Sequence, residues 1–288
     1  MNTVQLAASG VMDPFARDHK SELERIEMAA WLDFYAAAPG PFAKEAGLDA
    51  TRIGNFSVFA CKKFPDTFFN RSLGLGDAEP VTEAMLDRAV AWLRDHCGSE
   101  WAVTIGPDLA PADFPIWLAA RNLHLAHAGT TRFGRAATPI VPLVDCEFEV
   151  LLVPADRAAD FGRTARDGFD MPEHFDQWLG ALAGRPAWSA YVAYDRDIPI
   201  GVGAMFVHKD LAWLGLGATL PVYRGRGVQS AMLARRIRDA ATLGVKRLSI
   251  GTFYAGDGQA ANGSHRNVLR AGFSFSHVSR EYVAYGSF

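Results

Sequence analysis

The chain has 288 residues, of which 49% are hydrophobic and 21% charged, a composition typical of a soluble globular protein with two domains. It shows neither an apolar stretch long enough to span a membrane nor the basic start and apolar core of a signal peptide. The three cysteines lie far apart without a CxxC pair, which favours a reducing compartment, so we expect a cytoplasmic protein with no membrane partner.

The first predicted element is a helix over residues 20–37. Apolar side chains recur there at helical spacing between Ile26 and Phe34. Further along, two prolines interrupt the chain between Thr138 and Pro142, which predicts a domain boundary.

These signals predict an N-terminal helical segment (residues 1–45), a first lobe (46–140) and a second lobe (141–288). In the second lobe, short apolar runs separated by turn residues predict an antiparallel meander that leads into alternating helices and strands. Its predicted elements are a strand over 148–153, helices over 155–166 and 173–183, strands over 188–194, 199–207 and 212–219, and a helix over 228–243. The mixed order predicts an α/β fold, in the sense of an α+β arrangement on a mixed sheet.

The two lobes contain near-copies of one motif. Leu73–Val81 and Leu214–Val222 both read LGLGxxxPV, and Ala-Met-Leu follows in both copies. Each copy then continues as helix, strand, helix and strand at similar spacing, which predicts two tandem lobes related by internal duplication; chance recurrence of Leu and Gly is the alternative. The second copy has six additional residues, rich in Gly and Arg, where the first has Glu79 and Glu83. We therefore expect a ligand loop in the second lobe and a sealed, acidic turn in the first.

The loop Tyr223–Ser230 lies between a predicted strand and a predicted helix. Unpaired N–H groups at a helix N-terminus attract anions, together with the helix dipole. Gly225 and Gly227 allow consecutive N–H groups to face one concavity, and Arg224 and Arg226 add side chains suited to phosphate. The loop therefore predicts a pyrophosphate site, with a tight structural turn as the alternative.

The distribution of charge agrees with an anionic ligand. The net charge is −3, yet the segment from Thr219 to Phe288 holds ten Lys or Arg and three Asp or Glu. A basic segment in an acidic protein is typical of anion binding, and a solvated basic face is the alternative. We expect no nucleic acid as partner, because the basic residues have no interleaved aromatic residues.

Two other phosphate-binding loops do not fit the sequence. A dinucleotide fingerprint GxGxxG needs a third glycine where Ser230 stands. The segment Gly258–Gly263 has the glycine spacing of a P-loop, but Ser264 stands where lysine is required.

Arg224–Gln229 resembles the R/Q-x-x-G-x-G/A signature of the GNAT superfamily of acyl-CoA N-acyltransferases. Pro221–Tyr223 before it and Ala271–Phe273 after it are similar to the same family. The resemblance covers residues 148–288 and reaches 55–135 only through the internal repeat, as a degenerate GNAT-like lobe. It implies a GNAT-like fold and an N-acyltransferase, most simply an N-acetyltransferase. Such an enzyme transfers an acyl group from acetyl-CoA, or another short acyl-CoA, directly to a primary amine in a ternary complex.

The resemblance also implies which residues hold the cofactor. The strand ending at 217–219 would splay from its neighbour and offer backbone groups to the pantetheine arm, and the loop would hold the pyrophosphate. The residues implied to bind the cofactor are Gly217, Ala218, Thr219, Arg224, Gly225, Arg226, Gly227, Val228, Gln229, Ser230, Asn262 and Asn267. Gln229 departs from the small residue of the signature, and it would either crowd the pyrophosphate or donate its side-chain amide to it.

A second departure concerns the proton donor for the leaving thiolate. The family often has a tyrosine four residues before the glycine of its Gly-Phe pair, and Val268 stands at that position. The catalytic residues therefore stay unassigned. The candidate acids are Ser264, Tyr254 and Tyr282, and solvent is the alternative, since a thiol has a pKa near 8.5. The general base is equally open, with four candidates that are also typical of surface or packing positions: Asp257, Glu173, His174 and His208.

The remaining motifs favour structural roles. His124 and His127 have a metal-ligand spacing, but they lie in a predicted strand, where they would face opposite sides, so we expect no metal. Phe64, Phe68 and Phe69 are interpreted as core of the first lobe, with a wall of an acceptor pocket as the alternative.

The expected partner is a small-molecule amine. A non-catalytic module that binds or senses acyl-CoA is the alternative function, because the expected tyrosine is missing. The sequence does not specify the amine, the acyl chain length or the oligomeric state.

Overall fold

The computed structural model describes residues 19–77, 79–105, 110–138, 146–254 and 263–284. The helices are α2 (Lys20–Ala36), α3 (Gly40–Ala46), α4 (Glu83–His96), α5 (Phe114–Ala120), η2 (Ala155–Arg157), α6 (Ala158–Phe169), α7 (Phe175–Gly180), η3 (Pro221–Tyr223), α8 (Val228–Thr242) and α9 (Gly263–Arg270). The strands are β1 (Leu48–Ile53), β2 (Phe56–Cys61), β3 (Arg71–Leu73), β4 (Ala102–Ile105), β5 (Leu123–Ala136), β6 (Glu149–Leu152), β7 (Trp188–Asp195), β8 (Ile198–His208), β9 (Leu211–Thr219), β10 (Arg247–Phe253) and β11 (Ser274–Ala284).

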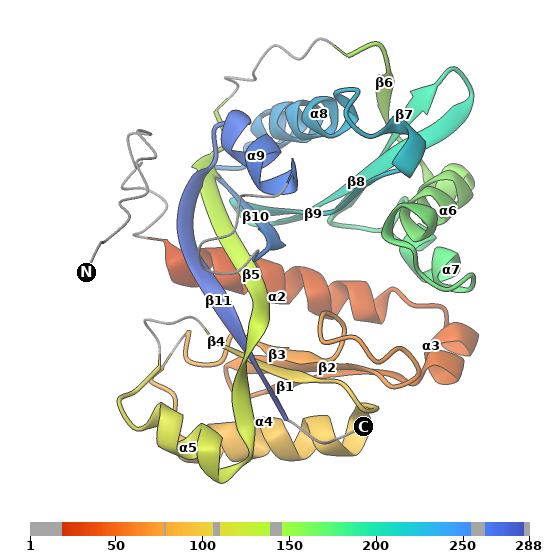
Figure 1. Ribbon diagram of the computed structural model, residues 1–288. Helices are drawn as coiled ribbons and strands as arrows, with labels where there is room; N and C mark the ends of the chain where they lie inside the picture. The colour runs from red at the N-terminus through yellow and green to blue at the C-terminus, as the bar shows by residue number, and fades with distance from the viewer. Residues whose placement is uncertain (1–18, 78, 106–109, 139–145, 255–262, 285–288) are drawn as a thin grey trace.

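The strands form one 11-stranded mixed sheet in the order β1-β2-β3-β4-β11-β5-β10-β9-β8-β7-β6. β5 and β11 lie side by side at its centre, and Figure 1 shows both running from one half of the molecule to the other. β11, which ends the second lobe, pairs with β4 of the first lobe. β5, which ends the first lobe, pairs with β10 of the second. The two lobes thus exchange their last strands.

The same order of elements occurs twice along the chain. The series α2-α3-β1-β2-β3-α4-β4-α5-β5 is followed by α6-α7-β7-β8-β9-α8-β10-α9-β11, with β6 as an additional edge strand. The predicted mixed α/β fold is therefore confirmed. The predicted helix over 155–166 begins as the short η2 and continues as α6, and the predicted strand around His124 is part of the 14-residue β5.

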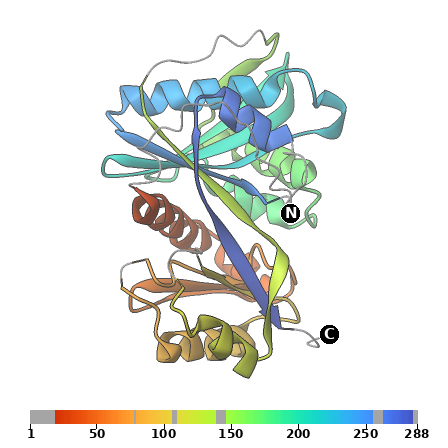
Figure 2. The same ribbon diagram turned by 60° about the vertical axis from the view of Figure 1, so that its left-hand side comes forward.

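Three hydrophobic cores hold the sheet and helices together. One core fills the second lobe beneath α8 and α9, and another fills the first lobe beneath α4 and α5. The third, which we call the central core, combines side chains of both lobes around α2. Figures 1 and 2 show α2 lying across the middle of the molecule, between the two halves. Each side of α2 thus buries apolar surface of a different lobe.

The sequence of α2 explains this central position. Ile26, Trp31 and Phe34 are almost completely buried, and Phe34 stacks on Trp178 of α7 with 4.1 Å between ring centroids. Two carboxylates of the same helix, Glu24 and Glu27, are buried as well. A helix buried on several faces is typical of an element enclosed by the rest of the protein.

The turn between β3 and α4 in the first lobe is filled by its own side chains. Leu75 and Val81 are buried in the core of that lobe. The side chain of Thr82 caps α4 by accepting a hydrogen bond from the Met85 N–H at 3.3 Å. The first lobe thus closes the position where the second lobe carries its glycine-rich loop.

Candidate functional site

β9 and β10 separate halfway along their length. They pair in parallel over four positions, which end at Leu214 and Ile250. On its other side, β10 stays paired with β5 as far as Phe253. Backbone groups at the end of β9 therefore face a gap between the two strands.

A bulge in β9 accompanies the separation. The register of β9 against β8 shifts between Gly215 and Ala218, and Leu216 between them has a left-handed φ of 49°. Branched residues rarely adopt this conformation, and a bulge bends the strand that contains it. The splay expected for the strand ending at 217–219 is present.

The gap opens into a cavity of about 530 Å³, which we call the α8 cavity. Its walls are the end of β9, the loop before α8, the first turn of α8 and the start of α9. Ten residues that the sequence analysis assigned to a cofactor line it: Gly217, Ala218, Thr219, Arg224, Gly225, Gly227, Val228, Gln229, Ser230 and Asn267. Arg226 does not line it, and Asn262 lies outside the described residues.

The loop before α8 leaves backbone donors at one end of this cavity. Gly225 and Gly227 have φ values of 81° and 84°, which favour glycine, and Gly227 is the N-cap of α8. As a glycine, Gly227 makes no side-chain cap, so the N-cap residue satisfies none of the N–H groups of the first turn through a side chain. A Cβ on Gly225 would meet no atom within 4 Å. The arrangement can accept a diphosphate at a helix N-terminus.

The two arginines of the loop point in different directions. Arg224 lines the cavity and donates to the Thr219 carbonyl at 3.2 Å. Arg226 forms an ion pair with Glu147 at 2.8 Å and lies over the ring of Phe148. Its side chain is therefore directed away from the cavity, which sequence reasoning did not anticipate, because Glu147 is 79 residues away along the chain.

Gln229 forms part of the cavity wall. Its side-chain amide donates to the Thr219 hydroxyl at 3.0 Å, which connects α8 to the end of β9. A Cβ on Gly217 would lie 3.1 Å from the Gln229 Oε1 atom, so a glycine at 217 leaves room for this side chain.

Two cavity-lining cations were missed in the sequence. Arg270, at the end of α9, lines the α8 cavity and contacts Asn267. Arg236, in the middle of α8, lines the same cavity although its side chain is 1% exposed. Both arginines belong to the basic segment, but residue spacing alone does not distinguish them from the surface arginines of α8 and α9.

Arg236 is buried without a carboxylate among the described residues. It donates through Nη1 to the carbonyls of Ala204 at 3.0 Å and Gly215 at 3.1 Å, and through Nε to Met232. Burial lowers the pKa of Arg236 to about 10. Glycine makes room for it, since a Cβ on Gly203 would lie 2.8 Å from its Cζ atom. Nη2 has no hydrogen bond to the described residues and lies at the cavity wall near Gly217.

A second cavity of about 250 Å³, which we call the α2 cavity, opens on the other side of the gap. Six residues line both cavities: Phe169, Gly215, Leu216, Gly217, Gly251 and Ser264. The two cavities therefore meet where β9 and β10 separate.

Aromatic side chains form much of the wall of the α2 cavity. Phe64, Phe68 and Phe69 come from the first lobe, while Trp213 and Phe253 come from β9 and β10. Phe68 and Phe253 lie 5.4 Å apart between ring centroids, so residues of both lobes meet at this wall. Phe69 also belongs to the central core. Phe64 and Phe68 pack against the same core, so these phenylalanines belong to the central core and not to the core of the first lobe.

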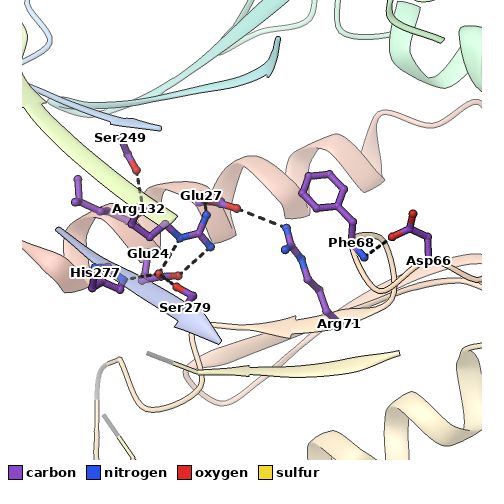
Figure 3. Close-up of polar contacts among 10 residues, drawn as sticks. Glu24, Glu27, Asp66, Phe68, Arg71, Arg132, Ser249, His277 and Ser279 are labelled. Carbon is purple, nitrogen blue, oxygen red and sulfur yellow. Dashed lines mark hydrogen bonds and ion pairs between the residues drawn. The ribbon is translucent and has the colours of Figure 1, made fainter. Parts of the chain in front are cut away.

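A buried network of charges lies beside the α2 cavity (Figure 3). Arg132 of β5 donates through Nε to Glu24 at 2.9 Å and through Nη1 to Glu27. Glu24 also lies 2.8 Å from the Nε2 atom of His277 and accepts from the hydroxyl of Ser279, both on β11. The network therefore connects α2 to both exchanged strands.

The partners in this network determine the charge of Glu24 and Arg132. Burial alone would raise the pKa of Glu24, but Arg132 and His277 lower it well below its usual value. Burial alone would lower the pKa of Arg132, but Glu24 and Glu27 outweigh burial and raise this pKa above its usual value. Both groups therefore stay charged at neutral pH.

Arg71 extends the network to the first lobe. Its Nη2 atom lies 3.6 Å from Glu27, and its guanidinium lies over the rings of Trp31 and Phe68. Burial lowers the pKa of Arg71, and Glu27 opposes this shift. Because these partners are distant from one another in sequence, no local motif indicated them.

The structure separates the candidate catalytic acids. Ser264 lines both cavities at the N-terminal end of α9. Tyr254 lines neither. Tyr282 packs on Phe114 in the core of the first lobe, where burial raises its pKa, so it is remote from the gap. Val268 is buried and lines the α8 cavity.

The candidate bases named from sequence do not line either cavity. Glu173, His174 and His208 are exposed, and Asp257 lies outside the described residues. Glu27 is a carboxylate that does line the α2 cavity. Sequence reasoning missed Glu27 because α2 precedes β9 and β10 by a long stretch of chain. Its position within that helix indicated only a buried face.

Within the described ranges, no group of three or more His, Cys, Asp or Glu side chains is arranged to hold a metal ion. None of the described helices is both long and apolar enough to cross a bilayer.

Comparison with known proteins agrees with this architecture. The sequence profile of the family described as "Acetyltransferase (GNAT) domain" matches residues 154–260. No curated protein sequence matches the chain. A GCN5-related N-acetyltransferase from Kribbella flavida has a similar structure, with a TM-score of 0.60 and 13% identity over 92% of this chain and 95% of its own.

Two further solved structures show the same fold. A GCN5-related N-acetyltransferase from Sphaerobacter thermophilus has a TM-score of 0.59 and 13% identity, covering 81% of each chain. A tandem GNAT protein from the clavulanic acid biosynthesis pathway has a TM-score of 0.54 and 14% identity over 93% of this chain and 96% of its own. The protein thus has the fold of the GNAT superfamily. The part of the chain that matches the family described as "Acetyltransferase (GNAT) domain", residues 154–260, includes β9, the glycine-rich loop and α8.

Proposed function

We propose that this protein is an N-acyltransferase that moves a short acyl group, in the first instance acetyl, from acyl-CoA to a primary amine in a ternary complex. The observation that carries the proposal is the meeting of two cavities at the gap between β9 and β10. One cavity has the donors for a diphosphate, and the other gives a second molecule access to the same gap.

The residues of the α8 cavity fit a CoA thioester. The uncapped first turn of α8 and the glycines before it would hold the diphosphate through backbone N–H groups. Arg224 and Arg270 line the same cavity and would add charge for the phosphates. The end of β9, which pairs with β8 but no longer with β10, would bind the pantetheine arm along its free side, as an added strand binds a sheet edge.

The thioester supplies an activated acyl carbon. At the gap, a backbone N–H of β9 beside Leu216 would stabilise the carbonyl oxygen as charge develops on it. The neutral amine attacks the acyl carbon, a C–N bond forms and the C–S bond breaks. The amine loses a proton to solvent, and the thiolate gains one from water, either directly or through the hydroxyl of Ser264, which would regain its proton from water. The protein contributes chiefly by positioning both reactants.

Gly225→Asp tests the anion site. We expect this variant to weaken acetyl-CoA binding at least 30-fold, because it places a carboxylate among the donors of the first turn of α8. Isothermal titration calorimetry with acetyl-CoA provides the measurement.

Gly244→Asp is the matched control. Gly244 has a φ of 76° and, like Gly225, no atom within 4 Å of an added Cβ, but it follows the other end of α8 and does not line the cavity. The control should bind acetyl-CoA as the wild type does. Equal binding by both variants, or no binding of acetyl-CoA to the wild type at millimolar concentration, would contradict the proposal.

A protein that senses acyl-CoA without turnover is the second candidate, because Val268 occupies the position of the family's tyrosine. The two functions differ in one measurement. An enzyme releases free thiol from acetyl-CoA when an accepted amine is added, whereas a sensor binds acetyl-CoA and releases none with any amine.

We further propose that the two lobes arose by internal duplication and that residues 46–140 are a degenerate copy. The repeated order of elements and the recurring LGLGxxxPV motif support this proposal. In this division, residues 1–45 supply the helix shared by both lobes, and residues 141–288 carry the cofactor site.

A further inference from the structure

The α2 cavity has a polar inner end, beside the gap, and an otherwise largely apolar wall. At the inner end, Gly251 of β10 leaves space, since a Cβ there would lie 2.8 Å from Arg132 Nη1 and 3.8 Å from Glu27 Oε2. This places the Glu27 carboxylate beside the gap. An amine that reaches the gap from this cavity therefore passes the Glu27 carboxylate.

Apart from its charged residues, the cavity is lined largely by rings and aliphatic side chains. The residues that carry this apolar wall are Phe68, Phe69, Met171, Leu179, Leu216 and Phe253. Burying a ring-sized apolar group against such a wall stabilises a complex by about 25 cal/mol per Å² of apolar surface. A volume of about 250 Å³ corresponds to roughly eight groups the size of a water molecule.

The charges of the cavity exclude several kinds of amine. Arg132 is the one Lys, Arg or His among the described residues of its lining, and all three of its guanidinium nitrogens are engaged by Glu24 and Glu27. The lining therefore has no cation available for a substrate carboxylate, which disfavours amino acids. Glu27 and Asp66 are its carboxylates, and Asp66 is exposed, so the buried part offers one anion and does not suit a polyamine.

We propose that the α2 cavity binds a small monoamine whose remaining part is uncharged, apolar and about the size of one ring. Glu27 holds the amino group at the gap, and the apolar part packs against the aromatic wall. This rests on the proposed function and specifies its acceptor. Arg132 orients the Glu27 carboxylate by a hydrogen bond, and Arg71 lies 3.6 Å from its other oxygen. Each carboxylate oxygen can accept a further hydrogen bond from an amine. Part of this acceptor site comes from outside the second lobe, through α2 and the loop that carries Phe68.

The first test compares amines on the full-length protein with acetyl-CoA. The probes are phenethylamine and isopentylamine against spermidine, L-lysine and triglycine, with thiol release as the measurement. We expect kcat/KM to be at least tenfold higher for the two apolar monoamines. A preference for spermidine, lysine or triglycine overturns the inference and leaves the transferase proposal intact.

Variants of the cavity wall form the second test. Met171 lines the α2 cavity and not the α8 cavity. Met171→Trp should fill the space and weaken the apparent affinity for phenethylamine, seen as a rise in KM of at least tenfold, while acetyl-CoA binding changes less than twofold. Met171→Leu should leave both quantities within twofold. An unchanged KM in Met171→Trp contradicts the inference.

Glu27→Gln tests the polar anchor. We expect KM for phenethylamine to rise at least tenfold with acetyl-CoA binding unchanged, which also shows that the variant is folded. Glu22→Gln is the control, because Glu22 lies on the same helix and pairs with an arginine, Arg247, without lining the cavity. Equal effects of the two substitutions would contradict a contact of Glu27 with the amine.

Direct binding separates a failure of this inference from a failure of the proposed function. Ligand-observed NMR with phenethylamine and the protein alone should show binding that Met171→Trp weakens at least tenfold. If acetyl-CoA does not bind, the transferase proposal fails, and this experiment still decides the cavity's ligand class. Absence of phenethylamine binding by the wild type overturns the inference.

Discussion

At the scale of single residues, Arg236 lines the α8 cavity although burial of its charge is unfavourable for stability. A buried cation costs free energy unless its charge is compensated, and no carboxylate among the described residues does so. Its compensation comes from the carbonyls of Ala204 and Gly215, and Gly215 lies at the bulge of β9. Such a residue is typical of a functional site, where stability is given up for a required charge.

Arg236→Met should weaken acetyl-CoA binding about tenfold, since it removes the Nη2 donor from the wall of the α8 cavity. The free energy of unfolding should change by no more than about 2 kcal/mol, because loss of a buried charge offsets the loss of three carbonyl contacts. Calorimetry measures the first quantity and urea unfolding the second.

Arg235→Met serves as the control for this prediction. Arg235 is the neighbouring residue of α8, pairs with Asp239 at 2.9 Å and does not line the cavity. Its replacement should leave acetyl-CoA binding unchanged. A wild-type affinity in Arg236→Met would show that this guanidinium serves the fold alone.

At this scale the sequence indicates those residues whose role depends on their near neighbours in the chain. Gly225 and Gly227 could be assigned because a glycine-rich loop before a helix has few structural interpretations. Glu27 and Arg132 could not, because each has its partner 105 residues away. Arg226 was expected to bind the cofactor as part of the glycine-rich loop, and in the structure its side chain pairs with Glu147.

At the scale of elements, the two strand-to-helix turns differ in their polar groups. The turn after β9 leaves backbone donors at the α8 cavity, whereas the turn after β3 carries a half-buried carboxyl group, Asp77. Burial and the nearby Glu24 raise the pKa of Asp77 to about 8. Its Oδ2 atom is buried without a hydrogen-bond partner among the described residues. Asp77 is therefore largely protonated at neutral pH.

This shift predicts a pH dependence of stability. The folded state holds the proton of Asp77 more tightly than the unfolded chain does, so the free energy of unfolding falls as pH rises from about 4 to about 8. Asp77→Asn removes this loss. We expect the variant to be more stable than the wild type by at least about 1 kcal/mol at pH 8, with a smaller difference at pH 4.5, by urea unfolding.

Asp95→Asn is a control for the removal of one carboxylate, since Asp95 is exposed on α4 of the same lobe. It should change stability equally at both pH values. A parallel pH profile for Asp77→Asn and the wild type would show that Asp77 is ionised in the folded protein.

Most helices and strands could be predicted from local patterns, and so could the ends of several of them. α8 agrees with its apolar periodicity and ends near Gly244, and the meander β7-β8-β9 agrees with its turn residues. The predicted helix over 173–183 is shorter in the structure, as Phe175–Gly180, because residues 182 and 183 continue as turns in which each N–H bonds to the carbonyl three residues earlier. The bulge at Leu216 has no sequence signal, since leucine is not a residue that favours positive φ.

At the scale of the whole molecule, the exchange of β5 and β11 makes the lobes dependent on each other. Without residues 1–140, β10 would lose its antiparallel neighbour and expose an unpaired edge. We expect residues 141–288 expressed alone to aggregate and to bind no acetyl-CoA. Co-expression with residues 1–140 should restore a soluble complex that binds acetyl-CoA, as measured by size exclusion and calorimetry.

A protease site inserted within residues 139–145 provides a control on the intact protein. After cleavage, the two pieces should co-elute in native buffer and separate in urea. A second half that is monomeric and binds acetyl-CoA alone would contradict the dependence.

The internal repeat indicated two lobes, but it could not indicate which strands they exchange. Local sequence determines that 123–136 and 274–284 become strands, whereas the choice of neighbour depends on the shared helix α2 and on contacts between distant segments. Glu24 illustrates this choice, because it bonds to Arg132 on one exchanged strand and to His277 on the other.

The pairing of β4 with β11 has a consequence for synthesis on the ribosome. Residues 102–105 emerge about 170 residues before the strand that covers them, which at 5–20 residues per second is a delay on the order of ten seconds or more. During that interval the first half has a bare sheet edge that other nascent chains can join. Slow codons after β5 would lengthen this exposure, so the yield of active protein should depend on chaperone supply and growth temperature more than its final stability implies.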